Sequence, residues 1–128
     1  MKYSELLKRQ EWISFRDKIL ERDKVCQLCK GRENLHVHHL TYFKSAKPWQ
    51  YPESMLIVLC NKCHKQEHEY YNLLIDLISF MRAKGMKSSE ILNTFFESTF
   101  DGDMMEFNEF RSASEHWRNI TKRLDRNK

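Results

Sequence analysis

Two pairs of cysteines are the residues whose types and spacing most directly predict chemistry in this sequence. Each pair has the form Cys-x-x-Cys, the first at Cys26 and Cys29 and the second at Cys60 and Cys63. Such a pair can place two thiolates on one side of a tight turn, so two pairs supply four ligands for a tetrahedral metal site. Zinc is the expected ion, and four thiolates leave it no open position, so its predicted role is structural. The alternative, four free cysteines buried in a core, fits poorly with the charged residues around both pairs.

Five of the six histidines lie within or just after the same stretch of chain. His38 and His39 are adjacent in an alternating, strand-like segment, and neighbouring strand residues point to opposite faces, so one ion is not expected to bind both. His64 and His68 are four residues apart in an expected helix and therefore share one face of it. Surface exposure without a function is the alternative for either pair. Together, the two pairs predict a second site beside the cysteines, open to a substrate.

The segments that carry these residues resemble the HNH endonucleases of the zinc-stabilised ββα-metal type. The resemblance lies in the runs CQLC, LHVHHLTY and LIVLCNKCHKQEH, which cover about a third of the chain. It implies that His38 and His64 bind a catalytic divalent ion, Mg²⁺ or another metal, and that His39 is the general base. It also implies that His68 is a third metal ligand or a phosphate contact. His36 has no role in the family pattern and is expected to face solvent.

These implied roles match what phosphodiester hydrolysis requires. The reaction needs an activated water, neutralisation of charge on the transition state and assistance to the leaving 3′ oxygen, and a divalent ion can supply the last two. A neutral histidine with a pKa near 6.5 can accept the proton of the water at physiological pH. The predicted function is therefore metal-dependent hydrolysis of DNA phosphodiester bonds, which leaves a 5′-phosphate and a 3′-hydroxyl.

One position departs from the family pattern. The middle asparagine of the motif is expected five residues before the third cysteine, where this sequence has Met55. In the family that asparagine braces the loop carrying the general base, whereas a methionine side chain offers only a weak sulfur acceptor. Ser54 and Asn61 are polar but out of register. A non-catalytic zinc-binding module that binds nucleic acid therefore stays open as the alternative function.

Basic residues near the two sites are candidates for contacts with DNA phosphates. They are Lys44, Lys47, Lys62 and Lys65, with Arg22 and Lys24 before the first cysteine pair. Residues 1–70 hold 13 Lys and Arg against 9 Asp and Glu, whereas residues 71–128 hold 9 of each, so the net charge of +4 belongs to the ligand-rich half. No arginine pair or recognition helix for reading bases stands out, so contacts with the backbone and minor groove are expected rather than sequence recognition.

The elements that must position these residues follow from periodicity and from helix-ending residues. An amphipathic helix is expected over residues 4–20, with its first residue as the N-cap. Residues 25–42 are expected to form a knuckle, a turn and an alternating strand in the manner of a hairpin. Residues 43–52 hold both prolines and are expected to be a loop. A short apolar run then leads into a helix over about residues 61–84, which Gly85 ends.

The remainder of the chain predicts two more helices, the first capped by Ser88 or Ser89 and the second spanning about residues 104–126. Apolar side chains of the last helix are expected to face inward: Phe107, Phe110, Trp117, Ile120 and Leu124. Residues 90–115 carry seven acids and one base, so this stretch should face away from DNA. Pairing of these helices with another copy or with a partner protein is expected, and a protein-interaction adaptor is a third hypothesis for the function.

Length and composition bound the class of protein. A chain of 128 residues with 41% hydrophobic and 31% charged residues predicts a globular α+β protein rather than a multi-domain enzyme. The expected organisation is a nuclease core with an N-terminal helix over residues 1–84 and a helical extension over residues 85–128 that packs on it. The N-terminus is charged and has no apolar signal core, so a cytoplasmic location is expected. In such a reducing compartment, clustered cysteines favour metal binding over disulfides.

Overall fold

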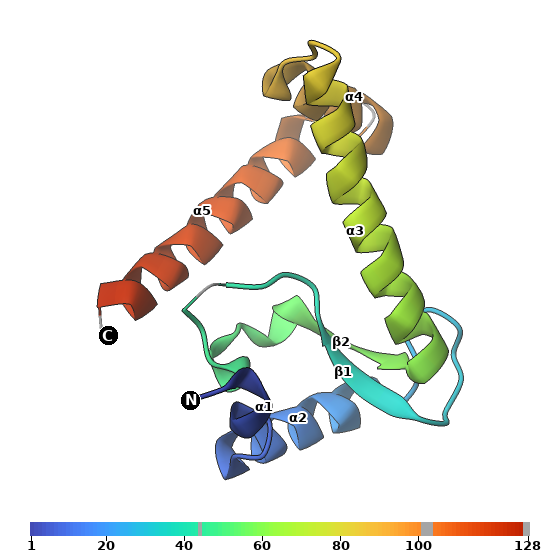
Figure 1. Ribbon diagram of the computed structural model, residues 1–128, viewed down its shortest axis with the longest axis vertical. Coiled ribbons are helices and arrows are strands. Elements are labelled where there is room, and N and C mark those ends of the chain that lie inside the picture. Colours follow the sequence, from blue (N-terminus) through green and yellow to red (C-terminus); the bar gives the residue numbers. More distant parts are fainter. Residues whose placement is uncertain (44, 101–103, 127–128) are drawn as a thin grey trace. The chain divides into compact units, whose positions relative to one another are not determined.

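The computed structural model describes residues 1–43, 45–100 and 104–126. These residues contain helices and one two-stranded antiparallel sheet, which confirms the mixed helix-and-strand class (Figure 1). The chain divides into two compact units, Met1–His68 and Glu69–Lys128. The boundary lies within one long helix, directly after His68. The predicted cysteine and histidine ligands therefore all belong to the first unit. Among the described residues, no helix is both long enough and apolar enough to cross a membrane.

The sheet of the first unit consists of strands β1 (Leu35–His39) and β2 (Leu56–Cys60). They are antiparallel, with His38 opposite Ile57 and His39 opposite Leu56. The predicted hairpin is therefore present as this antiparallel pair, but the prediction that it lies within residues 25–42 is wrong. The backbone groups of the knuckle at residues 26–31 bond to each other, since Cys26 N–H donates to the Gly31 carbonyl at 2.8 Å. Strand β1 therefore pairs with the later apolar run instead of with the knuckle.

The N-terminal segment forms two helices, α1 (Tyr3–Leu6) and α2 (Gln10–Asp23), where one helix was predicted. The N–H groups of Lys8 and Arg9 donate to carbonyls three residues earlier, at 3.1 Å in both cases, which ends α1 as a tight turn before α2 begins. The predicted N-cap at residue 4 is also wrong. Lys2 holds the N-cap position, and its N–H donates to the Glu5 carboxylate at 2.9 Å.

The core of the first unit lies on both faces of the small sheet. Helix α2 packs on one face through buried Trp12 and Ile19, and β2 supplies fully buried Leu56 and Val58. On the other face, Leu59 is fully buried and packs with two of the cysteines. Burial of large side chains on both faces of so short a sheet fixes its register, because a one-residue slip would exchange the two faces.

The connection between the strands is irregular, as predicted, apart from two short 3₁₀ helices, η1 (Pro48–Gln50) and η2 (Glu53–Met55). Buried Tyr51 anchors this connection, since its hydroxyl accepts the Phe43 N–H at 2.8 Å and the two rings stack with centroids 5.0 Å apart. The connection therefore wraps around the carboxyl end of β1.

Three helices follow β2: α3 (Asn61–Ala83), α4 (Ser88–Phe100) and α5 (Met104–Arg126). All three predicted helices are confirmed, but the predicted N-cap at Ser88 or Ser89 is wrong, because α4 already begins at Ser88. Gly85 adopts a φ of 101°, a backbone conformation that suits glycine after a helix. The prediction of inward-facing aromatic residues is wrong for Phe110, which is 42% exposed, and Phe95 in α4 is 41% exposed. The side chains of Phe107, Trp117, Ile120 and Leu124 lie outside the described residues.

Candidate metal centre

A cluster of three histidines lies where β1 meets the first turns of α3. One ring nitrogen each of His38, His64 and His68 lies within 4.8 Å of the others, close enough to hold one metal ion. His38 comes from the strand, and the other two are four residues apart on the helix, with their Nε2 atoms 3.2 Å apart. The direct passage from β2 into α3 sets this helix beside β1 and so brings together residues that are far apart in the sequence.

His38 is buried beside other histidines. Its side chain is 7% exposed, and burial together with His64, His68 and His39 lowers its pKa from 6.5 to about 4. Burial, with His68 and His36, also lowers the pKa of His64. Both rings are therefore neutral at physiological pH, which is the protonation state that binds a metal.

One buried nitrogen of this cluster, the Nδ1 atom of His38, lacks a hydrogen-bond partner among the described residues. A buried polar atom without a partner is costly, and a bound ion is one partner that removes this cost. The three histidines therefore fit a divalent metal ion in donor type and spacing.

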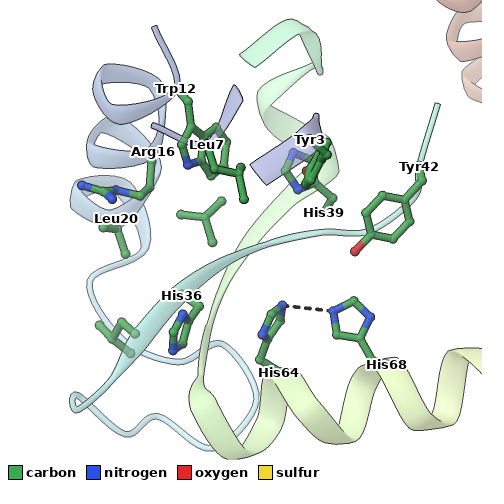
Figure 2. A pocket seen from close by; sticks show the side chains of 12 residues that line it. Tyr3, Leu7, Trp12, Arg16, Leu20, His36, His39, Tyr42, His64 and His68 are labelled. Atoms are coloured by element: carbon green, nitrogen blue, oxygen red, sulfur yellow. Dashed lines mark hydrogen bonds between the residues drawn. The ribbon is translucent and has the colours of Figure 1, made fainter. Parts of the chain in front are cut away.

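His39 points to the other side of β1, toward the N-terminal helices (Figure 2). It is 5% exposed and lies between Trp12, which stacks on it at 5.5 Å, and Tyr51, which meets it edge-on at 4.6 Å. Its Nε2 atom is 3.2 Å from the Pro48 carbonyl. Because a carbonyl can only accept, Nε2 carries the proton and Nδ1 keeps its lone pair. Burial lowers the pKa of His39, partly offset by the Pro48 carbonyl.

A groove of about 720 Å³ runs along β1 and is lined by four of the histidines, His36, His39, His64 and His68, but not by His38. His39 lines it on the α2 side of the strand, and His64 and His68 line it on the α3 side (Figure 2). His36 is exposed as predicted, but its ring also stacks on His64, with centroids 5.5 Å apart and an angle of 12° between the planes. The structure thus assembles all five clustered histidines around one strand, with a substrate-sized space beside them.

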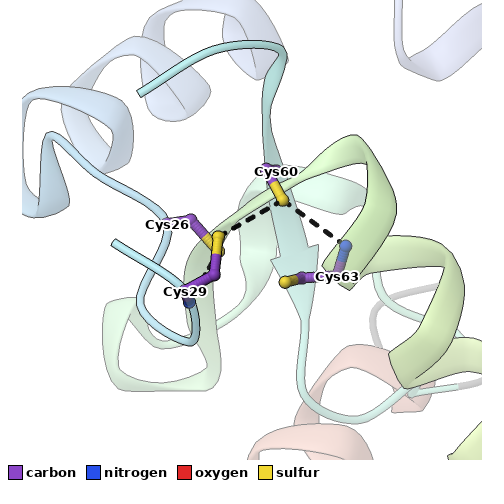
Figure 3. A group of neighbouring side chains, drawn as sticks. All are labelled: Cys26, Cys29, Cys60 and Cys63. Carbon is purple, nitrogen blue, oxygen red and sulfur yellow. Dashed lines mark hydrogen bonds between the residues drawn. The ribbon is translucent and has the colours of Figure 1, made fainter. Parts of the chain in front are cut away.

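The four cysteines form a second cluster (Figure 3). The sulfur atoms of Cys26, Cys29, Cys60 and Cys63 all lie within 4.8 Å of one another, so they are close enough to hold a metal ion. The sulfurs of Cys29 and Cys60 are 3.7 Å apart, too far for a disulfide bond, and all four cysteines are free thiols. The first pair comes from the knuckle after α2, and the second spans the junction of β2 and α3.

Backbone N–H groups point at the sulfurs in both pairs. The N–H of Cys29 lies 3.5 Å from the sulfur of Cys26, and the N–H of Cys63 lies 3.5 Å from the sulfur of Cys60. The N–H of Gly31 lies 3.4 Å from the sulfur of Cys29. Such contacts stabilise thiolates, which are the metal-binding form of cysteine.

The four thiols oppose one another's ionisation. Burial opposes ionisation of Cys26, but backbone N–H groups, Cys29 first, outweigh it and lower the pKa to about 6. The pKa of the Cys63 thiol rises to about 12. The largest cause is its interaction with Cys60, and burial and the other two sulfurs raise the pKa further. A divalent ion removes this opposition by neutralising the thiolates that it binds.

The basic residues predicted to contact DNA phosphates differ in their exposure and in their contacts within the fold. Lys47, Lys62 and Lys65 are exposed, and Lys44 lies outside the described residues. Arg22 is used within the fold, since its guanidinium donates to the carbonyls of Glu53 at 2.8 Å and Leu56 at 2.5 Å. The Arg22 prediction is therefore less well supported than the lysine predictions, because its donors already hold the connection and β2.

Several residues that build the site were not predicted from the sequence. Asp23 accepts the Val58 N–H at 2.9 Å and so ties the end of α2 to β2. Trp12, Tyr51 and the Pro48 carbonyl surround His39. Only Trp12 carried a signal, as an aromatic residue on the apolar side of the expected helix, because the other contacts depend on tertiary structure. Comparison of the chain with family models, curated proteins and solved structures finds no match.

Proposed function

We propose that the first unit is a zinc-stabilised ββα-metal nuclease of the HNH type, which hydrolyses DNA phosphodiester bonds. The observation that carries the proposal is the grouping of His38, His64 and His68 in one cluster, with His39 turned to the other side of the same strand. Zinc on the four cysteines would hold the knuckle, β2 and α3 together. The two clusters would then have different roles. Four thiolates fill the coordination shell of zinc, so that site would be structural. The histidine site adjoins the groove through His64 and His68, so a substrate could reach it.

The proposed chemistry assigns one step to each group. A divalent ion on the histidine cluster would neutralise charge on the phosphate and assist the leaving oxygen. His39 would take a proton from the attacking water through Nδ1, because its Nε2–H is held by the Pro48 carbonyl. The lowered pKa keeps this ring neutral, so it can act as a base at physiological pH. Lys62 and Lys65, exposed on the first turns of α3, would contact the phosphates on either side.

Met55 does not by itself oppose this proposal, because the backbone supplies a brace at the same position. The Leu40 N–H, directly after His39, donates to the Met55 carbonyl at 2.8 Å. The Met55 side chain is 5% exposed and packs in the core beneath the connection. The loop around the proposed base is therefore held by a main-chain hydrogen bond and by apolar packing rather than by an amide side chain.

A non-catalytic zinc module that binds nucleic acid is the second candidate. The observation that favours it is the same substitution, since no side-chain amide reaches the end of β1 from this position. In that case the histidines would donate hydrogen bonds to phosphates, and the groove would bind DNA without cutting it. The two functions differ in one measurable property, cleavage in the presence of a divalent metal.

Plasmid cleavage tests the nuclease proposal. Purified chain with Mg²⁺ or Mn²⁺ should nick supercoiled plasmid, and His39→Ala should reduce the rate by about 10² to 10⁴, because the general base is removed. EDTA should abolish cleavage. His116→Ala is the matched control, since His116 is an exposed histidine of the second unit. Cleavage by His39→Ala at the parental rate would exclude His39 as the base, and DNA binding without cleavage across several metals would favour the second candidate.

A further inference from the structure

The second half of α3 exposes an unusual amount of apolar surface. Seven of its large side chains are between 44% and 64% exposed. They are Tyr70, Tyr71, Leu73, Leu74, Ile75, Leu77 and Phe80, and this set is called the α3 apolar face. A monomeric protein seldom exposes so many neighbouring apolar residues, so the face marks an interaction surface.

The spacing of these residues suits another helix. The apolar positions include a seam with alternating steps of four, three and four residues: Tyr70, Leu74, Leu77 and Met81. This is the spacing of a coiled-coil contact. The polar residues Asn72, Asp76 and Ser79 occupy the remaining side of the helix. A helix with so broad an apolar arc is normally covered by neighbours on more than one side.

The second unit does not cover this face with its own described residues. Among them, Ile91 is the one buried apolar side chain, at 4% exposure. Helices α4 and α5 contact each other, while Leu92 and Phe95 of α4 are also more than 40% exposed. The unit therefore has a small core and a large apolar surface, which is the pattern of a fold completed by association.

The exposed area is large enough for a stable dimer. Seven side chains, each about half exposed and each offering on the order of 100 Å², give roughly 700 Å² per chain. A standard interface buries about 800 Å² per partner. The α3 apolar face, with the exposed residues of α4, therefore reaches the size that a specific dimer requires.

The charges of α5 favour a second copy of this chain as the partner. Residues 104–115 carry three acids and one base, whereas residues 116–126 carry four bases and one acid. When two such helices run antiparallel, the acidic half of each faces the basic half of the other. A two-fold axis produces this arrangement, because the same surface is used on both partners.

We propose that residues 69–126 form a two-fold homodimer in which a second copy covers the α3 apolar face and the α5 helices run antiparallel. The inference does not depend on nuclease activity, because it concerns the second unit alone. Sedimentation equilibrium of the zinc-loaded full chain at 1–100 µM should give twice the 15.6 kDa mass of one chain. A single-chain mass at 100 µM overturns the proposal and indicates that the chain's own helices cover the face.

Matched substitutions test the surface. Leu73→Glu with Leu77→Glu should weaken dimerisation by at least about 100-fold, because two charges would be buried in the apolar contact. Asn72→Glu with Ser79→Glu adds the same charges on the polar side of α3 and should leave the mass unchanged. Equal dimerisation by both double variants overturns the assignment of this face.

Charge reversal tests the partner even where the leucine variants fail to fold. Glu109 and Lys122 are exposed on opposite halves of α5. Glu109→Lys and Lys122→Glu should each weaken self-association by about 3- to 10-fold, less at high salt. Mixing the two variants should restore a dimer of one chain of each, because the reversed charges then face their opposites. Absence of this mixed dimer overturns the antiparallel pairing.

Discussion

At the scale of single residues, two adjacent histidines have different surroundings because strand geometry sends them to opposite faces. His38 meets His64 and His68, whereas His39 meets Trp12, Tyr51 and the Pro48 carbonyl. Burial lowers the pKa of both rings, so both stay neutral near pH 7. One environment offers several nitrogens to an ion, and the other fixes the tautomer of a single ring, which are the requirements of a ligand and of a base.

The buried His38 should make folding stability depend on pH. Its pKa falls from 6.5 to about 4, so between these values the unfolded chain binds a proton that the folded chain does not. The free energy of unfolding should therefore fall as pH drops from 6.5 to 4, by at most about 3 kcal/mol. Urea unfolding of the parent and of His38→Asn, without added divalent metal, isolates this contribution as the difference in pH dependence.

The control for the His38 variant is a histidine that is exposed rather than buried. His116→Asn alters an exposed residue of the second unit and should leave the pH dependence of the parent intact. Loss of zinc at acid pH affects all three chains and cancels in the differences. If the parent and His38→Asn lose stability in parallel between pH 6.5 and 4, His38 is not held neutral by the fold.

At the scale of elements, the cysteine cluster joins the knuckle to β2 and to the start of α3. The knuckle contacts β2 through the Gln27 N–H, which donates to the Val58 carbonyl at 2.9 Å, and through the packing of Cys26 with Leu59. The knuckle turn also needs Lys30 in the left-handed region, at a φ of 64°. A metal ion that binds all four sulfurs would therefore contribute directly to folding of the first unit.

One tightly bound zinc per chain is the expected metal content. Cys26→Ser or Cys60→Ser should remove the zinc and unfold the first unit at 25 °C, because structural zinc contributes about 10 to 16 kcal/mol in small zinc domains. Elemental analysis and circular dichroism measure the two effects. Leu28→Ser is the control, since Leu28 lies between the first two cysteines and is 54% exposed. A metal-free parent with unchanged stability would contradict the prediction.

A second connection between elements depends on Asp23. Its carboxylate accepts the Val58 N–H at 2.9 Å and the Arg22 Nε–H at 2.7 Å. Asp23→Ala should lower the free energy of unfolding by about 1 to 3 kcal/mol, because the N–H of a fully buried residue loses its partner. Asp17→Ala removes an ion pair with Arg16 at a side chain that is 59% exposed, and should cost less than about 1 kcal/mol. Equal losses in urea unfolding would show that Asp23 does not act through Val58.

The elements that were predicted from the sequence are those with local causes. Helix α3 begins at Asn61 as expected and ends one residue before the predicted residue 84, because the apolar period and Gly85 act along one segment. The pairing of β1 with β2 was missed because it joins residues across a 16-residue connection. The break between α1 and α2 was missed because residues 7–9 include neither proline nor glycine.

The same distinction between local and tertiary causes applies to the candidate site. Residue types and spacing predicted the set of four cysteines, and the family resemblance implied the set of three histidines; the structure brings each set close together. The surroundings of His39 were not predictable, because Trp12, Pro48 and Tyr51 reach it only after α2 and the connection have packed. Sequence patterns thus identify the donors, and tertiary packing sets their protonation states.

At the scale of the whole molecule, positive charge and metal-ligand clusters belong to the same half of the chain. Residues 1–70 carry the entire net charge of +4, and the described metal-ligand clusters lie in the first unit. The remainder is balanced in charge and exposes apolar helices. If the first half binds nucleic acid, its lysines should account for the salt dependence of binding, and lysines of the second half should not.

Substitution of equal numbers of lysines in the two halves tests this division. Lys62→Glu with Lys65→Glu should weaken binding to duplex DNA and reduce the slope of log K against log salt by about 0.9 for each phosphate that the variant no longer neutralises. Lys84→Glu with Lys87→Glu changes the net charge by the same amount in exposed residues of the second unit and should leave the slope near that of the parent. Fluorescence anisotropy of a labelled duplex from 50 to 200 mM salt, about the range over which phosphate binding weakens steeply, measures both slopes. Equal changes in the two variants would mean that net charge alone governs binding, and an unchanged slope in the first would remove α3 from the DNA-binding surface.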